Sequence, residues 1–366
     1  MSHLFRPPST VALLMVMPLL ALTPPGINAM EPAGAQPPPY MRVKNVEGRF
    51  TIAGSNTMFP LMTRLAADFK RYYPDVAIGV EGQGSKSVSA DEAPASNPFW
   101  EMVQNKSVYR RGDGSDFGHH VSMQVHVLAS SRKLSEADLQ TFRSRYGYSP
   151  IEIPIALEAV AVYVHRDNPI QGLTLKQVDA IFSADHLRGL NEDLATWGQV
   201  GLKETWQHAP IHTYGRDSRS GTREFFKEQV LLKGGFRQTL REVPGSASLI
   251  VAIEKDLEGI GYSGIGYQSS SVRIVPLASK DGGSYVLPTE ETTTDGTYPL
   301  TRELYLYVNQ KPGETMNPAL FEFLKYVNSR EGQDTVVRAG VYRLPINEME
   351  KNRSRLMDET LTAYKR

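Results

Sequence analysis

The run IEIPIALEAVAVYV, residues 151–164, lies near the middle of the chain and is apolar over almost its whole length. Its Ile, Val, Ala and Tyr residues favour a strand that is buried on both faces. A second strand-like run, 298–308, returns the chain after a long intervening segment. We interpret the two runs as crossover strands, with the crossings near 155–165 and 285–305.

Strand-like and helix-like segments alternate on both sides of these runs. The expected strands are residues 49–54, 76–80, 125–129, 151–164, 211–214, 260–262, 272–275 and 298–308. The expected helices start near Pro60, Ser135, Thr174, Arg223 and Ser246, and three more cover 318–329, 331–339 and 347–364. Such alternation is typical of α/β proteins, in which mixed or mostly parallel sheets carry helices on both faces.

Two such units, joined by the crossover strands, predict a hinged protein with two lobes. We expect the first lobe to contain residues 46–158 and 290–366, including the C-terminal helices, and the second lobe to contain residues 159–289. The segment 86–120 is polar and contains prolines, and it predicts one short helix at 98–103 between long loops.

The N-terminal part has a different composition. Nine of the 24 prolines lie in the first 40 residues, and an apolar run covers 11–22. This run is too short to span a bilayer as a helix, and small residues follow it. We predict a secretory signal peptide over 1–29, with cleavage after Ala29 or Ala35, and a linker over 30–45. The alternative is a disordered tail.

The composition excludes several classes of function. The 366 residues include 40 basic and 40 acidic ones, so the net charge is zero, whereas a nucleic-acid binder carries a clear positive excess. The chain has no cysteine, which excludes disulfides, thiol nucleophiles, cysteine-bound metals and the lipidated cysteine of a bacterial lipoprotein. Because no other segment approaches about 18 apolar residues, we expect a soluble mature protein.

Four turns rich in hydroxyl groups each follow an expected strand. They cover residues 54–57, 82–85, 129–132 and 216–222. Ligands of open α/β sheets bind at such strand ends, and free backbone N–H groups at a helix start favour an anion. The last turn is the most informative, because an arginine, two hydroxyls and a glycine gather there, and arginine forms forked bonds with oxyanions. The alternative is that each serine or threonine only caps its helix.

The sequence resembles the periplasmic phosphate-binding protein family, the substrate-capturing component of high-affinity phosphate import. The matching stretches are GSNTM (54–58), EGQGS (81–85), SSRKL (130–134), IPIALEAVAVYVHRDNPI (153–170), LTLKQVDAIFS (173–183), YGRDSRSGTREFFKE (214–228), PGSASLIVAI (244–253) and IGYSGIGY (260–267). The resemblance implies a two-lobed periplasmic-binding-protein-like fold that closes on dehydrated phosphate. Together with the turns, it predicts a phosphate-binding set: Ser55, Thr57, Ser85, Ser131, Arg132, Arg216, Ser220, Gly221 and Thr222.

The third turn departs from the family pattern. Many members place an Asp there to accept the proton of phosphate, whereas residues 130–132 of this chain read Ser-Ser-Arg, as in a branch of the family that looks similar. A proton acceptor in the site disfavours sulfate. Because the third turn has none, the sequence does not decide whether the ligand is phosphate or another oxyanion. Asp217 is the nearest carboxylate in the sequence, and we expect it to pair with Arg216 or Arg219.

Two other patterns carry little weight. The glycines at 259, 261 and 264 match the dinucleotide-binding spacing G-x-G-x-x-G, but a strand-like run follows them instead of a helix. The histidines at 119, 120 and 126 lack the spacing of a metal site on a helix. We therefore expect neither a nucleotide nor a metal.

The sequence thus predicts a periplasmic solute-binding protein, not an enzyme, that captures inorganic phosphate by hydrogen bonds alone for ABC-type import or phosphate sensing. We expect a membrane permease as its partner, no nucleic acid, no cofactor and a monomer. The nearest alternative is a binding protein for another tetrahedral oxyanion, such as sulfate or molybdate. An alternative from another class is a secreted phosphatase-like enzyme, which would need a base or metal beside a nucleophile.

Overall fold

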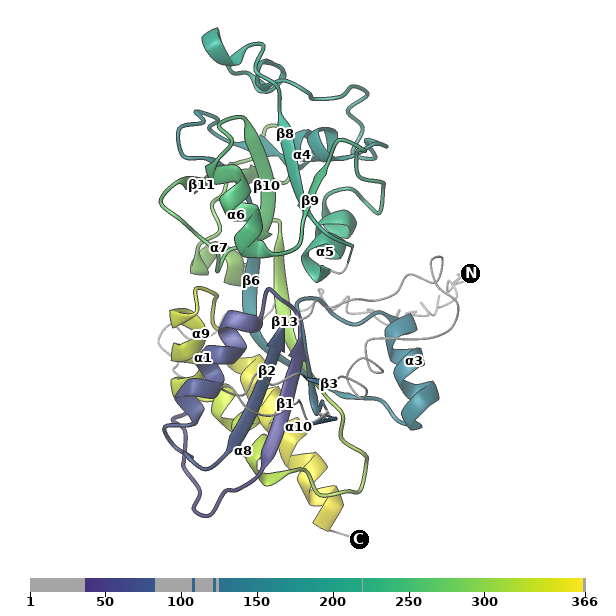
Figure 1. Cartoon of the computed structure of the whole chain (residues 1–366), viewed down its shortest axis with the longest axis vertical. Coiled ribbons are helices and arrows are strands. Elements are labelled where there is room, and N and C mark those ends of the chain that lie inside the picture. Colours follow the sequence, from purple (N-terminus) through teal and green to yellow (C-terminus); the bar gives the residue numbers. More distant parts are fainter. Residues whose placement is uncertain (1–36, 83–106, 109–120, 123–124, 219, 365–366) are drawn as a thin grey trace, which may run out of the picture. The chain divides into compact units, whose positions relative to one another are not determined.

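The computed structural model describes residues 37–82, 107–108, 121–122, 125–218 and 220–364 (Figure 1). These residues belong to one compact unit, 36–366. The predicted signal peptide, Ser85 and the predicted short helix at 98–103 lie outside the described residues. Among the helices that are described, none is both long and apolar enough to cross a membrane.

Helices and strands alternate along the chain, as the sequence predicts. The strands are β1 (Arg49–Gly54), β2 (Ala77–Gly82), β3 (Ser107–Val108), β4 (Val121–Ser122), β5 (Val127–Ser130), β6 (Ile151–His165), β7 (Leu173–Thr174), β8 (His212–Arg216), β9 (Arg241–Val243), β10 (Gly259–Gly264), β11 (Val272–Ile274), β12 (Leu277–Ala278) and β13 (Thr301–Val308). The α-helices are α1 (Phe59–Phe69), α3 (Glu136–Tyr146), α4 (Leu175–Phe182), α5 (Gly221–Gln229), α6 (Ser246–Glu254), α7 (Glu290–Thr294), α8 (Pro318–Val327), α9 (Arg330–Arg338) and α10 (Ile346–Tyr364).

Strand β6 connects two parts of one sheet. The sheet has the order β2-β1-β5-β13-β6-β10-β8-β9, and β11 also pairs with β6. The first half of β6 pairs with β13 from Ile151 to Ala159, and the second half pairs with β10 from Val160 to Val164 (Figure 1). β6 is therefore the first predicted crossover strand, and β13 is the strand that returns the chain.

The sheet is mixed, because both crossover strands run against their neighbours. β6 is antiparallel to β13, β10 and β11, and β13 is antiparallel to β5. The strands farther out are parallel, in the pairs β1–β2, β1–β5, β8–β10 and β8–β9. The expectation of mostly parallel strands is thus correct away from the two crossover strands, and the mixed α/β class is confirmed.

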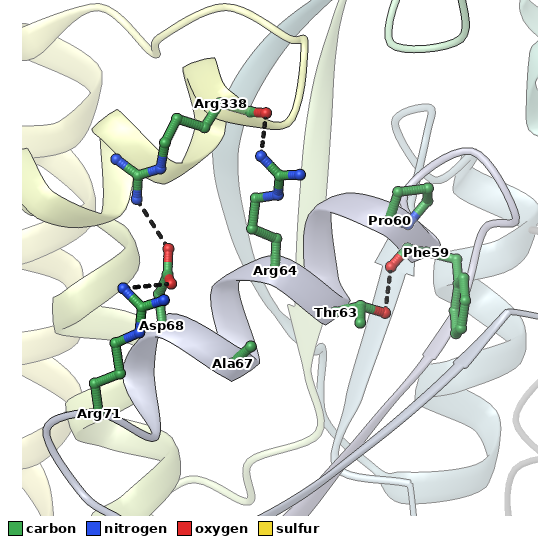
Figure 2. A pocket seen from close by; sticks show the side chains of 8 residues that line it. All are labelled: Phe59, Pro60, Thr63, Arg64, Ala67, Asp68, Arg71 and Arg338. Atoms are coloured by element: carbon green, nitrogen blue, oxygen red, sulfur yellow. Dashed lines mark hydrogen bonds and ion pairs between the residues drawn. The ribbon is translucent and has the colours of Figure 1, made fainter.

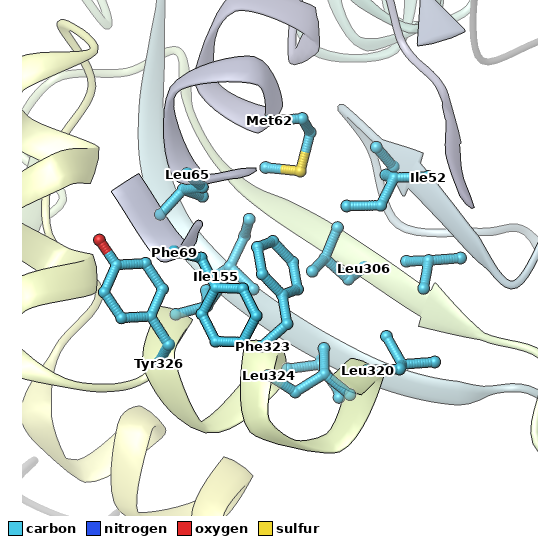
Figure 3. Packing of buried hydrophobic residues seen from close by; sticks show 14 of the residues in the cluster. Ile52, Met62, Leu65, Phe69, Ile155, Leu306, Leu320, Phe323, Leu324 and Tyr326 are labelled. Atoms are coloured by element: carbon cyan, nitrogen blue, oxygen red, sulfur yellow. The ribbon is translucent and has the colours of Figure 1, made fainter. Parts of the chain in front are cut away.

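The two largest clusters of buried hydrophobic residues pack against the two parts of the sheet. The first combines residues from 50–156 with residues from 304–356, among them Ile52, Phe69 and Phe323 (Figure 3). The second consists of residues between 159 and 300. The cores change over between 156 and 159, at the predicted lobe boundary of 158, and again between 300 and 304, later than the predicted boundary of 289, because Tyr298 and Leu300 belong to the second core. The hydrogen bonds of the sheet continue through β6. The division into lobes at these residues stays a prediction.

Local sequence signals set several helix starts. Ser135 caps α3 in a reciprocal arrangement with Asp138, and Thr174 caps α4 in the same way with Gln177. Helix α5 begins at Gly221, two positions before the expected start at Arg223, because the Ser220 side chain accepts the Arg223 N–H and caps the helix.

The described end of the predicted linker has a defined place although it forms no helix or strand. The Tyr40 ring lies edge-on to Tyr72 and Tyr326. The Tyr40 hydroxyl donates to Glu322 of α8 over 2.8 Å. This part of the segment is therefore packed against the first core.

Candidate functional site

The first hydroxyl turn leaves the end of β1 close to the end of β5. Gly54 has a φ of +143°, a conformation that L side chains rarely adopt, and an added Cβ would lie 2.2 Å from the Ala129 carbonyl oxygen. This close approach lets the Ser55 N–H donate to that oxygen over 2.8 Å. The Thr57 N–H in turn donates to the Ser55 hydroxyl over 3.2 Å. Ser55, Thr57 and the neighbouring Ser131 are all buried.

The fourth turn buries an arginine at the end of β8. Arg216 is 1% exposed, and its Nη1 donates to the Ser246 hydroxyl at the start of α6 over 2.7 Å. Its Nε is buried and has no hydrogen-bond partner among the residues that the structure describes. Burial lowers the pKa of Arg216, and the nearby Asp217 opposes this shift. A buried cation with an unused donor is suited to hold an anion.

The first and fourth turns meet through two hydroxyl groups. The Oγ1 atoms of Thr57 and Thr222 are 3.1 Å apart and form a buried hydrogen bond. Beside them, the Tyr267 hydroxyl donates to the Asn56 carbonyl oxygen over 3.0 Å. Burial, followed by the Glu158 charge, raises the pKa of Tyr267 to about 12, so this hydroxyl stays protonated at neutral pH.

A buried ion pair adjoins this hydroxyl pair. Glu158 of β6 and Arg302 of β13 are partners in the antiparallel ladder. Arg302 donates to Glu158 Oε2 from Nε over 2.9 Å and from Nη2 over 2.6 Å, and their side chains are only 3% and 1% exposed. Nη2 also donates to Thr222 Oγ1 over 2.9 Å. Within the described part of the chain, the buried Nη1 has no partner.

The ion pair is held by packing on two sides. The Arg302 guanidinium lies over the Phe225 ring, 5.4 Å from its centroid. Gly264, at the end of β10, leaves room for the carboxylate, because a Cβ there would lie 2.0 Å from Glu158 Oε1 and 3.1 Å from Thr57 Cγ2. Burial raises the pKa of Glu158, and the Arg302 charge opposes this shift.

The structure thus brings together part of the predicted ligand set. Thr57, Thr222 and Arg216 lie around the buried pair, and Ser220 caps the helix that starts with Gly221. By sequence alone, each serine or threonine among them could be only a helix cap. Their common surroundings, with two buried cations, favour a binding role.

Two further residues of the predicted set are not placed with these side chains by the described structure. Ser85 lies outside the described residues. Arg132 Nη1 donates to Asp138 Oδ2 over 3.0 Å and to the Lys133 carbonyl oxygen over 2.9 Å, at the start of α3. The same carboxylate accepts the Ser135 N–H in the helix cap. The place of Arg132 in the ligand set stays a prediction.

The sequence reasoning missed Glu158, Arg302 and Ser246. A signal for Glu158 was present, because it is an acidic residue in an almost continuous apolar run, and buried charges are paired. Its partner, Arg302, could not be predicted, because the pairing depends on the register between β6 and β13. That register shifts at a bulge between Leu304 and Tyr305.

Other clusters do not coincide with this site. A surface pocket of about 740 Å³ lies between α1 and α9 and is lined by Phe59, Pro60, Thr63, Arg64, Ala67, Asp68, Arg71 and Arg338 (Figure 2). Two of its arginines, Arg71 and Arg338, approach the Asp68 carboxylate at 3.5 and 2.8 Å. The predicted ligand residues are absent from this lining.

The structure describes the glycine motif and one of the three histidines to which the sequence analysis gave little weight. The glycines at 259, 261 and 264 lie on strand β10, as expected. They do not form the turn between a strand and a helix that binds a dinucleotide. His126 Nδ1 accepts the Thr51 N–H over 3.2 Å, and the other two histidines lie outside the described residues. His212, Asp256 and Glu258 form a cluster on β8 and beside β10, in which Asp256 also accepts the Tyr214 hydroxyl over 2.7 Å.

Comparisons with known proteins identify the family of this chain and agree with its fold. A family model described as a PBP superfamily domain matches residues 42–331. The phosphate-binding protein PstS of Pseudomonas aeruginosa is 41% identical over 325 residues, which cover 89% of this chain and 91% of the relative. The chain therefore belongs to the PBP superfamily and, within it, to the family of the phosphate-binding protein PstS.

Solved structures show the same fold at lower identity. An ABC-type phosphate transport receptor from Vibrio cholerae has a TM-score of 0.55 and 20% identity, and the match covers 81% of this chain and all of that one. A high-affinity periplasmic phosphate-binding protein, PfluDING, solved with bound phosphate, has a TM-score of 0.61 and 14% identity, with 84% and 93% coverage. The fold is thus the two-lobed periplasmic-binding-protein-like fold that the sequence predicts.

Proposed function

We propose that this chain captures inorganic phosphate in the periplasm and presents it for ABC-type import or phosphate sensing. The observation that carries the proposal is the pair of buried guanidinium groups of Arg216 and Arg302, each with an unused N–H donor among the described residues, beside the hydroxyls of Thr57 and Thr222. Charge-assisted and neutral hydrogen bonds from these groups suit a small oxyanion without a metal.

The names of the relatives support phosphate as the ligand. The Pseudomonas protein, 41% identical, is named for phosphate binding, and the Vibrio structure is described as a transport receptor of the ABC type. Because these relatives are phosphate-binding proteins, we expect this chain to be a monomer whose partner is a membrane permease. Export would follow from the signal peptide over 1–29, and the lack of cysteine leaves no residue for a lipid anchor of the bacterial lipoprotein kind.

The ligand set that we propose keeps the sequence prediction and adds two residues. It consists of Ser55, Thr57, Ser85, Ser131, Arg132, Arg216, Ser220, Gly221 and Thr222, with Glu158 and Arg302 beside them. The lobes that contribute these residues would be 46–158 with 290–366, and 159–289. Support for the boundary at 158 comes from the two hydrophobic cores, which separate between 156 and 159, whereas they separate again only between 300 and 304.

The site favours binding over catalysis. A hydroxyl nucleophile needs an adjacent base. In the described structure the Thr57 and Thr222 hydroxyls bond to each other, and Thr222 also accepts from Arg302, a cation that cannot take up a proton. The nearby carboxylate, Glu158, is paired with Arg302, which donates two hydrogen bonds to it. We therefore propose that the protein is not an enzyme, and that a phosphatase activity is absent.

Calorimetric titration of the purified mature protein with phosphate, arsenate, sulfate and molybdate tests the proposal. We expect phosphate to bind most tightly and with one site per chain. Tighter binding of sulfate or molybdate would identify that ion as the ligand instead of phosphate. Hydrolysis of a phosphate monoester would favour the phosphatase-like enzyme. Mass spectrometry of the exported protein should find its first residue at Met30 or Gln36.

A further inference from the structure

We infer that Tyr267 is a positioning residue for the anion site, because its hydroxyl group holds the peptide group that carries Thr57. The inference rests on the proposed function, since it assumes that the Thr57 hydroxyl contacts the bound anion. Tyr267 follows β10 and lies outside the predicted ligand set. Its hydroxyl donates to the Asn56 carbonyl oxygen over 3.0 Å, across 211 positions of sequence. This bond connects the first hydroxyl turn with a segment of the second predicted lobe.

The peptide group between Asn56 and Thr57 is held at both of its polar atoms. Its carbonyl oxygen accepts from Tyr267, and its N–H, which belongs to Thr57, donates to the Ser55 hydroxyl over 3.2 Å. Because a peptide group is planar, the two hydrogen bonds together fix its orientation. That orientation directs the Thr57 side chain, whose Oγ1 lies 3.1 Å from Thr222 Oγ1. Loss of the Tyr267 bond would therefore release the Thr57 hydroxyl from this position.

A tight turn fixes Tyr267 from its own side. The Tyr267 N–H donates to the Gly264 carbonyl oxygen over 3.3 Å, which closes a four-residue turn at the end of β10. Within this turn, Ile265 is packed in the second core, and its N–H donates to the Ala159 carbonyl oxygen over 2.9 Å. The tyrosine ring thus extends from a turn that is anchored in the second core.

The same turn also meets the residues that end α9. A Cβ at Gly340 would lie 3.3 Å from the Gly266 Cα atom, and a Cβ at Gly266 would lie 3.4 Å from the Ala339 carbonyl oxygen. These contacts do not involve the tyrosine hydroxyl. Removal of that hydroxyl should therefore leave the turn in place and affect only the bond to Asn56.

The hydroxyl of Tyr267 acts as a neutral donor. Burial, followed by the Glu158 charge, raises its pKa to about 12, although the Arg216 charge opposes the shift. Both charged residues belong to the group around the hydroxyl pair, so Tyr267 lies close to the site. A tyrosine hydroxyl has a single hydrogen to donate, and here the Asn56 carbonyl oxygen receives it. Tyr267 therefore acts on the anion through Thr57 and not as a ligand.

Substitution of Tyr267 by phenylalanine removes the hydroxyl and keeps the ring. Calorimetric titration should show phosphate binding weakened about threefold to tenfold, the range for one neutral hydrogen bond. The matched control is Tyr148→Phe, because the Tyr148 hydroxyl is also half-buried and donates to Asn309 over 2.7 Å. This control should bind phosphate as the wild type does. Circular dichroism and urea unfolding check that both variants fold.

A double-mutant cycle distinguishes a positioning role from a general effect on the fold. If Tyr267 acts through Thr57, Tyr267→Phe should weaken phosphate binding less than about twofold in the Thr57→Val background, where the positioned hydroxyl is absent. A purely structural role predicts the same loss in both backgrounds. That result, or unchanged phosphate affinity in Tyr267→Phe, would overturn the inference and leave the proposed function intact. A wild type that binds no phosphate would overturn both.

Discussion

The hydroxyl groups of Thr57 and Thr222 are 3.1 Å apart although the two residues are 165 positions apart in the sequence. One follows β1, and the other lies in the first turn of α5. Arg302 donates to the Thr222 oxygen, so the Thr222 hydroxyl hydrogen is directed elsewhere, toward Thr57 or a ligand. This contact connects the first turn with the fourth, which is the turn that the sequence marks most clearly as anion-binding.

Removal of either hydroxyl should weaken phosphate binding. Thr57→Val and Thr222→Val keep the side-chain shape, and a neutral hydrogen bond contributes about 0.5–1.5 kcal/mol, up to about tenfold in affinity. Thr222→Val should have the larger effect, because it also leaves Arg302 Nη2 without one acceptor. Calorimetric titration measures both, and Thr63→Val on the exposed face of α1 is the control. Equal affinities of all three variants would place the ligand elsewhere.

Arg216 should contribute more than any hydroxyl. A hydrogen bond to a charged group is worth about 1.5–3 kcal/mol, and a loss of about 3 kcal/mol is roughly a hundredfold in affinity. We therefore expect about a hundredfold weaker phosphate binding in Arg216→Ala, with circular dichroism confirming the fold. Arg71→Ala, in the surface pocket of Figure 2, is the control and should bind as the wild type does. If Arg71→Ala is the weaker binder, the surface pocket is the site.

A methyl group on Gly264 should disturb the Glu158 carboxylate without removing any charge. The new Cβ would lie 2.0 Å from Oε1, far inside van der Waals contact, so the carboxylate must move. Gly264→Ala should lower phosphate affinity about tenfold or more and lower the melting temperature. Gly235→Ala is the control, since its Cβ would meet its nearest neighbour at 3.6 Å. Wild-type binding by folded Gly264→Ala would show that the carboxylate position does not matter.

Gly54 should be required for the fold of the first turn. A side chain at its φ of +143° is strained, and the Cβ would lie 2.2 Å from the Ala129 carbonyl oxygen. Gly54→Ala should therefore destabilise the protein by at least about 1–3 kcal/mol in urea unfolding. Ala129 on the neighbouring strand already carries a Cβ without this strain, so Ala129→Gly serves as the comparison. Equal stability of Gly54→Ala and wild type would contradict the close approach of β1 and β5.

Asp256 should make stability depend on pH in the acid range. Burial raises the pKa of Asp256, but the hydrogen bonds from Tyr214 and His212 outweigh it and hold the pKa below its ordinary value of 3.8. A carboxyl with a lowered pKa stabilises the folded state above the unfolded pKa, and this contribution is lost as the pH falls through the folded pKa. Asp256→Asn should thus lower the free energy of unfolding by about 1–3 kcal/mol at pH 7.

The difference between Asp256→Asn and the wild type should shrink as the pH falls from about 4 through the lowered pKa of the folded state, because both side chains are uncharged below that pKa. Urea unfolding at a series of pH values measures this. The control is Asp281→Asn, whose exposed carboxylate lies 3.5 Å from Lys176 and should matter little at any pH. A pH-independent difference for Asp256→Asn would show that its charge is not what stabilises the cluster.

Much of the fold was predictable because its signals are local. The apolar run at 151–164 is strand β6, and the caps at Ser135 and Thr174 start α3 and α4 as expected. The glycines of β10 lie in a strand because the residues between them are β-forming, not because of the motif spacing. The site was predicted in part, since hydroxyls and arginine at a helix start have a direct physical meaning for anions.

The sequence by itself determined the alternation of strands and helices, the positions of the hydroxyl turns and the kinship with a phosphate-binding family. These follow from residue types within a few positions of one another. Only the tertiary structure decided that Glu158 faces Arg302 across 144 positions and that Thr57 meets Thr222. The reason is strand register, which long-range packing sets, and a shift of one residue would turn Arg302 to the opposite face of the sheet.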